Sequence, residues 1–153
     1  MDITSEKWMS RMLTLAHEIA LWSKDNSTKV GAVITTEDGR PMSWGFNGFP
    51  IGISDNVEAR HERPMKYKWM AHAEQNAIDL APGNSLQDGV IFVTFSPCSA
   101  CARSIIQNGI KKVVVDSRFT AEKMPERWQE DMLTAVEMLG EAGVEVIEGN
   151  IIE

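Results

Sequence analysis

The chain has 153 residues, of which 43% are hydrophobic and 24% charged, a composition typical of one globular domain spanning residues 1–153. The formal net charge of -7 argues against broad attraction to nucleic acid, which requires a basic surface. No signal-peptide pattern and no apolar run of membrane-spanning length is present. We therefore expect a cytoplasmic protein with no nucleic-acid polymer and no membrane as partner, and the charge does not exclude a small anionic substrate.

The N-terminal segment predicts an amphipathic helix, because its apolar residues recur at helical spacing. The stripe consists of Trp8, Met12, Leu15, Ala16 and Ile19. His17 falls on the opposite side, where we expect it to be solvated. The polar segment Ser23–Lys29 ends the helical pattern. A strand over Val30–Thr35, a tight turn at Asp38-Gly39 and a partner strand over Met42–Phe46 then predict a β-hairpin.

The segment Asn47–Pro64 is rich in Gly, Pro, Asn and Asp and predicts a long loop, a feature that is usually functional in a compact domain. A helix is expected over Met70–Leu80, closed by Pro82-Gly83. The nearly continuous apolar run Val90–Phe95 predicts a strand that is buried on both faces.

The pattern after that strand predicts a helix with Ser96 as its N-cap, Pro97 at its first position and Asn108-Gly109 at its end. The remaining predicted elements are a strand over Lys112–Asp116, a helix over Pro125–Leu139 and a strand over Val144–Ile147. Strands that alternate with helices indicate an α/β fold, which we expect to be a three-layer α-β-α sandwich around a mixed five-stranded sheet.

Three side chains have the chemistry of a catalytic zinc site. Cys98 and Cys101 are the only cysteines, and with His72 they supply two thiolates and one imidazole, which leaves a fourth position open. An open position is typical of catalytic zinc, and the chain has no third cysteine to close it. His17 and His61 lack ligand spacing to the cysteine pair. A helix start favours thiolates, and the three-residue spacing places both sulfurs on one turn.

Glu74 is the candidate proton carrier, two residues after His72. On a regular helix these two positions point in roughly opposite directions, so they converge only if the segment forms the first turn and the metal lies at its end. In that arrangement zinc would acidify a bound water, and Glu74 could take the proton and pass it to a ring nitrogen and then to the leaving amine.

The whole combination is far more specific than its parts. A C-x-x-C pair alone fits a redox dithiol or an incidental helix face, and an H-x-E triplet alone is weak. H-x-E followed by P-C-x-x-C is the signature of zinc deaminases. A thioredoxin-like dithiol at Cys98 and Cys101, and a non-catalytic zinc-binding module, remain the alternatives from other classes.

The chain resembles the cytidine and deoxycytidylate deaminase superfamily over nearly its whole length, and most closely its deoxycytidylate (dCMP) deaminases. The matching segments are Lys29–Ile34, Gly45–Pro50, Ser54-Asp55, His72–Ile78, Ser96–Ala102 and Gln107–Val113. The resemblance implies a cytidine deaminase-like fold, zinc held by His72, Cys98 and Cys101, and Glu74 as the proton carrier. The implied reaction converts dCMP into dUMP and ammonia, feeding thymidylate synthesis.

The resemblance also implies substrate contacts. Asn47 matches the asparagine that contacts the sugar, and the backbone around Ala73 and Ser96 would read the base edge. Candidates for phosphate recognition are Lys24, Ser27, Thr28, Lys29 and Arg118. Candidates for stacking on the pyrimidine are Phe46, Phe49, Trp69 and Phe119. Solvation or core packing is the competing interpretation of each.

Two departures from the family pattern affect the expectations. The loop Ile51–Trp69 holds only His61 and no cysteine, so we expect one zinc per chain rather than two. Phe46 replaces a tyrosine that is usual in the family, which removes a hydroxyl. Family members are often hexamers, and some are regulated by dCTP and dTTP, so we expect a homo-oligomer. Cytidine or deoxycytidine, guanine and tRNA adenosine remain alternative substrates, of which the acidic charge disfavours tRNA.

Overall fold

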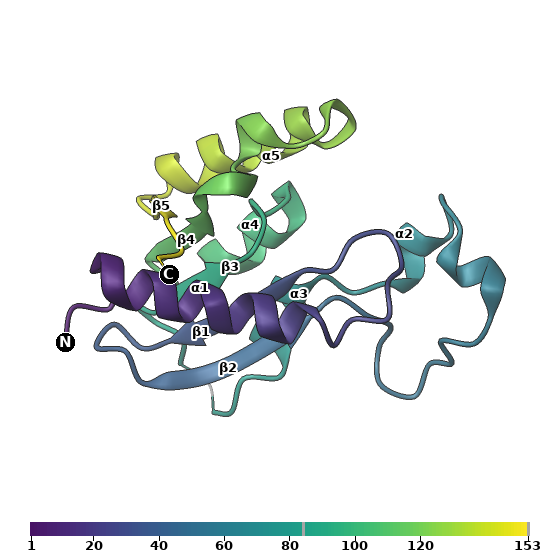
Figure 1. Cartoon of the computed structure of the whole chain (residues 1–153), viewed down its shortest axis with the longest axis horizontal. Coiled ribbons are helices and arrows are strands. Elements are labelled where there is room, and N and C mark those ends of the chain that lie inside the picture. The colour runs from purple at the N-terminus through teal and green to yellow at the C-terminus, as the bar shows by residue number, and fades with distance from the viewer. Residues whose placement is uncertain (84, 153) are drawn as a thin grey trace.

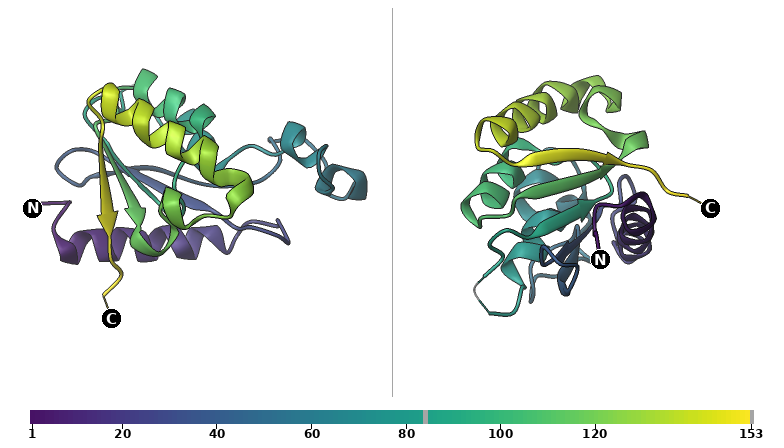
Figure 2. Two further views of the ribbon diagram at one scale, coloured as in Figure 1. Left: turned by 90° about the horizontal axis from the view of Figure 1, so that it is seen from above. Right: turned by 90° about the vertical axis from the view of Figure 1, so that its left-hand side faces the viewer.

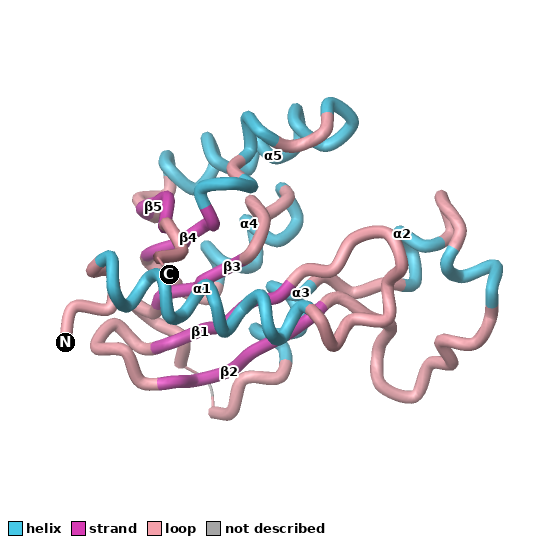
Figure 3. Tube along the Cα trace, viewed as in Figure 1, coloured by secondary structure: helices cyan, strands magenta, loops and turns pink. Residues whose placement is uncertain are grey.

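The computed structural model describes residues 1–83 and 85–152, and its centre is one five-stranded sheet with the strand order β2-β1-β3-β4-β5 (Figures 1 and 3). The strands are β1 (Gly31–Thr35), β2 (Pro41–Phe46), β3 (Val90–Val93), β4 (Lys112–Asp116) and β5 (Glu145–Gly149). β1 pairs antiparallel with β2 and β3, whereas β3, β4 and β5 run parallel. The predicted mixed five-stranded sheet is confirmed.

Helices cover both faces of the sheet. They are α1 (Glu6–Ala20), α2 (Lys66–Trp69), α3 (Ala73–Asp79), α4 (Ser99–Gln107) and α5 (Glu126–Glu141), with short 3-10 turns η1 (Glu58–His61), η2 (Ser117–Phe119) and η3 (Ala121–Lys123). Figure 2 shows α1 on one face and α4 and α5 on the other, which gives the expected three layers. Within the described residues, no helix has the length and apolar character needed to cross a membrane.

The two faces of the sheet carry two apolar clusters, because successive side chains of a strand point to opposite faces. Val33, Phe92 and Val114 pack with α1 in one cluster. In the other cluster, the neighbouring strand positions pack with buried residues of α3, α4 and α5. All four residues of β3 are buried, as the apolar run predicted.

Gly45 of β2 decides how closely α3 approaches the sheet. A Cβ at this position would lie 2.4 Å from the Ala73 carbonyl oxygen and 2.5 Å from the Ala77 backbone nitrogen. Any other residue would therefore push the start of α3 away from the strand. The glycine fixes the N-terminus of α3 against the sheet, which is where the H-x-E motif lies.

The predicted stripe on α1 is partly wrong. The buried residues are Met9, Ser10, Leu13, Ala16, Ile19 and Ala20, whereas Leu15 is 43% exposed. Trp8 and Met12 are only partly buried, at the margin of the cluster. His17 is not solvated as expected, because its Nε2 lies 2.7 Å from an oxygen of the buried Asp116 carboxylate. The apolar residues of α1 are compatible with two overlapping helical faces. The face that packs on the sheet contains Met9 and Leu13 and not the predicted Leu15.

The predicted helix over Met70–Leu80 begins later than expected. Ala71 pairs with Gly48 through two backbone hydrogen bonds, which keeps the chain extended there. This pairing separates the short α2 from α3, which starts at Ala73. Residues 48–71, named here the arm, project from the sheet beyond this pairing (Figure 1).

The predicted N-cap at Ser96 is also wrong. Ser96 is buried, and its N–H donates to the Phe119 carbonyl 3.1 Å away, so it lies before the helix. Cys98 is the N-cap of α4, and its sulfur accepts from the Cys101 N–H at 3.5 Å. The helix starts at Ser99, two residues after Pro97. The cap is therefore one of the cysteines, which places that sulfur at the end of the helix rather than on its side.

Candidate metal centre and active site

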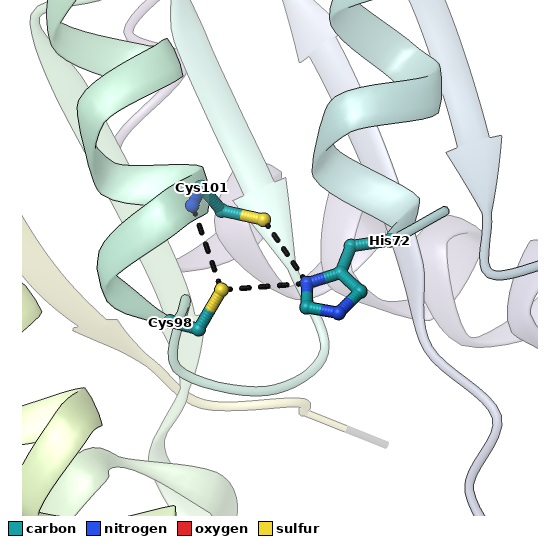
Figure 4. Close-up of side chains that lie close together, drawn as sticks. All are labelled: His72, Cys98 and Cys101. Atoms are coloured by element: carbon teal, nitrogen blue, oxygen red, sulfur yellow. Dashed lines mark hydrogen bonds between the residues drawn. The ribbon is translucent and has the colours of Figure 1, made fainter. Parts of the chain in front are cut away.

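His72, Cys98 and Cys101 meet at one point, at the N-terminal ends of α3 and α4. The His72 Nδ1 lies 3.3 Å from the Cys98 sulfur and 3.4 Å from the Cys101 sulfur (Figure 4). All three ligand atoms lie within 4.8 Å of one another. Two sulfurs and one ring nitrogen at such separations can share one tetrahedral zinc ion and leave its fourth position open.

Helix geometry brings these three side chains together. His72 and Cys98 are the N-cap residues of α3 and α4, and both have extended backbone conformations. The two helix N-termini therefore face the same point, and their positive ends favour the anionic sulfurs. Hydrogen bonds with Cys101 and His72 lower the pKa of Cys98 to about 4 against the opposing effect of burial, whereas the hydrogen bond with Cys98 and burial raise the pKa of Cys101. The donor set fits zinc, which binds thiolates and needs them deprotonated.

Glu74 lies beside this cluster. It is the second residue of α3 and is 4% exposed. Because His72 at the N-cap is extended (φ -79°, ψ 157°), the rule that places positions i and i+2 on opposite sides of a helix does not apply to this pair. Burial raises the pKa of Glu74 to about 7, although the nearby His72 partly opposes the rise. The carboxyl group thus lies beside the metal ligands and out of bulk water.

A cleft of about 430 Å³ opens onto the metal cluster. Its lining includes Asn47, Ala73, Glu74 and Ser96, as well as two of the metal ligands. The lining residues outside these predicted positions are Asp25, Thr28, Val30, Arg63, Lys66, Tyr67, Met70, Phe95, Arg127, Trp128, Asp131 and Met132. The structure therefore brings together the zinc cluster, the proposed proton carrier and the positions implied to contact the sugar and the base.

Of the five predicted phosphate contacts, Thr28 lines this cleft, whereas Lys24, Ser27, Lys29 and Arg118 do not. The Lys24 ammonium lies 2.8 Å from the Asp55 carboxylate. Ser27 is exposed and accepts a hydrogen bond from Arg63 at 3.0 Å. The Lys29 ammonium donates to the Ser23 carbonyl. Arg118 binds Asp116 through its side chain at 2.6 and 3.0 Å. The contacts of Ser27, Lys29 and Arg118 thus stabilise the loop before β1 and the end of β4.

Asn47 is buried and holds the loop between α1 and β1 in place. Its Oδ1 accepts the Val30 N–H at 2.8 Å, and its Nδ2 donates to the Thr28 carbonyl at 2.9 Å. The same Nδ2 reaches the Asp25 carboxylate at 3.3 Å. Asn47 thus shapes one wall of the cleft, and its implied contact with the sugar stays a prediction.

Sequence reasoning missed a buried ion pair in the same wall. The Lys66 ammonium lies 2.8 Å from the Asp25 carboxylate, and their side chains are 10% and 4% exposed. Asp25 also accepts the backbone N–H groups of Ser27 and Thr28 at 2.8 and 3.2 Å. The pair ties the arm to the loop after α1. No sequence signal marks it, because its partners are 41 residues apart.

Replacing Asp25 with Asn is expected to destabilise the fold by about 3 kcal/mol at neutral pH, because it leaves the buried Lys66 ammonium without a charged partner. Burial alone would raise the pKa of Asp25, but the hydrogen bonds from Lys66, Ser27 and Thr28 outweigh it and lower the pKa below 3.8. A lowered folded-state pKa stabilises the fold above the unfolded pKa, and this stability is lost as pH falls through the folded value. Urea unfolding at several pH values measures the effect.

The difference in the free energy of unfolding between the unmodified protein and Asp25→Asn should therefore be largest above about pH 5 and should shrink as pH falls below 3.8. Asp79→Asn is the control, because it removes an exposed carboxylate at the end of α3. A free-energy difference that stayed constant down to the acid limit would contradict this origin of the stability.

The aromatic residues of the cleft also differ from those suggested by the sequence. Phe95, Tyr67 and Trp128 line it. The four sequence candidates contact other rings or cations instead: Phe46 packs on Trp22, Phe49 on His61, Trp69 on Arg60, and Phe119 on Phe95. Of these four ring and cation contacts, the one made by Phe119 is with a residue that lines the cleft. Long-range packing decided which rings face the cleft.

Comparisons with known proteins agree with this site. The family described as the cytidine and deoxycytidylate deaminase zinc-binding region matches residues 6–117. An uncharacterised deaminase of Aliivibrio fischeri is 44% identical over 92% of this chain and 92% of its own length. Human deoxycytidylate deaminase is 34% identical over 71% of this chain, and the match spans 64% of the human protein.

A solved structure shows the same fold. It is the dCMP deaminase of the cyanophage S-TIM5 in complex with dCMP and dUMP. It superposes with a TM-score of 0.74 and 26% sequence identity over 95% of this chain and 98% of its own. The similarity therefore extends over the sheet, all its flanking layers and the site between α3 and α4.

Proposed function

The chain belongs to the cytidine and deoxycytidylate deaminase zinc-binding family, and on this premise we propose that it deaminates dCMP to dUMP and ammonia, feeding thymidylate synthesis. It is a zinc-dependent deaminase, with the zinc-binding cluster formed by His72, Cys98 and Cys101. The similarity to an enzyme solved with dCMP and dUMP supports a nucleotide substrate.

Two arginines in the lining of the cleft are the observation that carries the choice of a phosphorylated substrate. Arg63 and Arg127 line it, although the chain as a whole has a net charge of -7. Within the described part of the chain, neither guanidinium has a carboxylate within 4.0 Å. Two guanidinium groups that are not neutralised by close ion pairs, in a cleft about the size of a nucleotide site, favour an anionic ligand.

The protein groups have distinct roles in the proposed reaction. Bound zinc supplies Lewis-acid activation of a water molecule. Glu74 would take one proton from the water and give it to the ring nitrogen as the hydroxide adds to the ring carbon that carries the amine. It would then take the second proton, from the added hydroxyl, and give it to the amine, so that the C–N bond breaks and ammonia leaves. The carboxyl group is suited to this exchange because it is 4% exposed and lines the cleft beside the metal ligands. We propose that Asn47 contacts the sugar and that the backbone around Ala73 and Ser96 reads the base edge, which their places in the lining of the cleft support.

The two arginines should control the preference for a phosphorylated substrate. We expect Arg63→Gln and Arg127→Gln each to lower kcat/KM for dCMP by roughly 10- to 100-fold, since a hydrogen bond to a charged group contributes about 1.5–3 kcal/mol. Activity on deoxycytidine should change little, because it carries no phosphate. Steady-state ammonia release with both substrates measures the difference.

Arg40→Gln is the matched control, because this arginine lies in the hairpin beside Asp38. Equal losses on dCMP and deoxycytidine in the cleft variants would place the arginines in a structural role instead. An unmodified enzyme that turned over deoxycytidine, guanine or cytidine but not dCMP would overturn the proposed substrate.

Several finer properties remain predictions that accompany this proposal. We propose one zinc per chain, a single domain over residues 1–153, a cytoplasmic location and a homo-oligomer, with a hexamer as the size that the family suggests. Regulation by dCTP or dTTP is testable by adding each nucleotide to the dCMP assay. Light scattering of the purified protein gives the oligomeric state directly.

A further inference from the structure

The first half of α5 forms a wall of the cleft but has little support from the core. The buried residues of α5 are Ala135 and Leu139, both in its second half. Arg127, Trp128, Asp131 and Met132 line the cleft and recur with a spacing of four, so they share one face of the helix. Core packing therefore holds the far end of α5 and leaves its cleft-facing turns to be fixed by other contacts.

Asp131 joins this wall to the metal site. The Asp131 Oδ2 accepts the Ser99 backbone N–H at 2.9 Å, and its Oδ1 accepts the Ser99 hydroxyl at 2.6 Å. Ser99 is the first residue of α4 and lies between Cys98 and Cys101 in sequence. Gln129 makes a further hydrogen bond, to the Glu122 carbonyl at 2.8 Å, but Glu122 lies only seven residues earlier in the chain. The contact to Ser99 thus reaches across to the metal-binding turn itself.

The chemistry of this contact suits a helix cap supplied from another element. The first N–H groups of α4 have no partner within the helix, and a carboxylate at this end is also favoured by the helix dipole. Cys98 accepts the Cys101 N–H, and Asp131 accepts the Ser99 N–H. Both hydrogen bonds fix the same turn, one from within α4 and one from α5. Both carboxylate oxygens of Asp131 bind Ser99, and among the described residues the cluster of potential metal ligands contains His72, Cys98 and Cys101 without Asp131.

We propose that Asp131 is a positioning residue that caps the metal-binding turn of α4 and locks it to the cleft wall of α5. Through Ser99 it fixes the directions of the two cysteine sulfurs. Through α5 it fixes Arg127 and Trp128 at the mouth of the same cleft. Loss of the carboxylate should therefore weaken zinc binding and increase the mobility of the cleft wall formed by α5, without exposing the apolar core.

The test uses zinc-loaded protein and the variants Asp131→Ala and Asp131→Asn. We expect Asp131→Ala to speed zinc transfer to the chelator 4-(2-pyridylazo)resorcinol roughly five-fold, the size of effect expected when a helix N-terminus loses its capping acceptor. Asparagine keeps one acceptor oxygen and should recover part of the loss. Ser99→Ala removes only the hydroxyl donor and should give an intermediate rate. In cobalt-substituted protein, the absorption bands of the thiolate site should shift in the same order.

Glu130→Ala is the control, because it removes a neighbouring exposed carboxylate on α5 with the same change in charge. An unchanged transfer rate and cobalt spectrum in Asp131→Ala, or equal changes in the control, would overturn the proposal. KM for the substrate should rise more than kcat falls, and this kinetic arm alone rests on the proposed function. The zinc-transfer rate and the cobalt spectrum are measured without substrate. They therefore test the role of Asp131 even if dCMP is not the substrate.

Discussion

Glu74→Gln is expected to lower turnover about 10³-fold or more while zinc stays bound, because the change removes the proton carrier and none of the metal ligands. Glutamine has nearly the same volume as glutamate, so the buried position at the start of α3 remains filled. The variant also loses a negative charge that lies near the Cys98 sulfur, which favours retention of the thiolate. Metal analysis and dCMP turnover on the same preparation measure both expectations.

Glu58→Gln serves as the control, because it makes the same chemical change at an exposed position in η1. The experiment also separates an enzyme from a zinc-binding module, since a purely structural module would tolerate Glu74→Gln with no loss of function. Substantial turnover in this variant would remove Glu74 from the mechanism. Loss of zinc in it would mean that the carboxyl supports the metal instead of moving a proton.

Cys98→Ala is expected to produce the second large effect, the loss of zinc together with all turnover. The change removes one of three ligands and also the N-cap of α4. Loss of an outer-shell partner alone costs roughly 10- to 100-fold in metal affinity, so loss of a direct ligand should cost more. The missing cap should add about 1 kcal/mol of destabilisation near α4. Metal content after dialysis measures the loss of zinc, and thermal unfolding measures the destabilisation.

His61→Ala is the matched control for the metal prediction. His61 lies in the arm, where its Nε2 is 2.6 Å from the Asp55 carbonyl oxygen, so its loss should leave zinc at one per chain. Zinc at full stoichiometry in Cys98→Ala would contradict the ligand set. A dithiol enzyme would instead show both cysteines reacting freely in the native protein, whereas a zinc site protects them until a chelator is added.

Polar contacts hold the arm in its place at one wall of the cleft. Its contacts to the loop after α1 are polar: Lys66 binds Asp25, Arg63 binds Ser27, and Lys24 lies 2.8 Å from Asp55. The opposite wall is held to α4 by Asp131. Specific polar contacts therefore hold the cleft-facing part of each wall, whereas the second half of α5 packs on the apolar core through Ala135 and Leu139. Changes in the walls are expected to alter substrate preference more readily than they alter the sheet.

The sequence by itself predicted the elements whose signals are local. Apolar periodicity predicted the five strands and the helices α1, α3, α4 and α5 to within a few residues, but not α2 or the 3-10 turns. The alternation of strands and helices predicted the mixed sheet. The residue types of the H-x-E and P-C-x-x-C segments indicated zinc chemistry, because two thiolates and one imidazole form a set of three ligands. The sequence could not show that Glu74 approaches the metal, because positions two residues apart on a regular helix point in roughly opposite directions.

The tertiary structure decided what depends on distant parts of the chain. Pairing of Ala71 with Gly48 keeps His72 extended at the start of α3, and this brings Glu74 to the zinc cluster. The buried Asp25–Lys66 pair and the cap from Asp131 to Ser99 join residues 41 and 32 positions apart. No local pattern encodes such contacts, since each forms only after the sheet has placed its helices. The metal chemistry of His72, Cys98 and Cys101 was therefore evident from residue types, whereas the shape of the cleft around it came from packing.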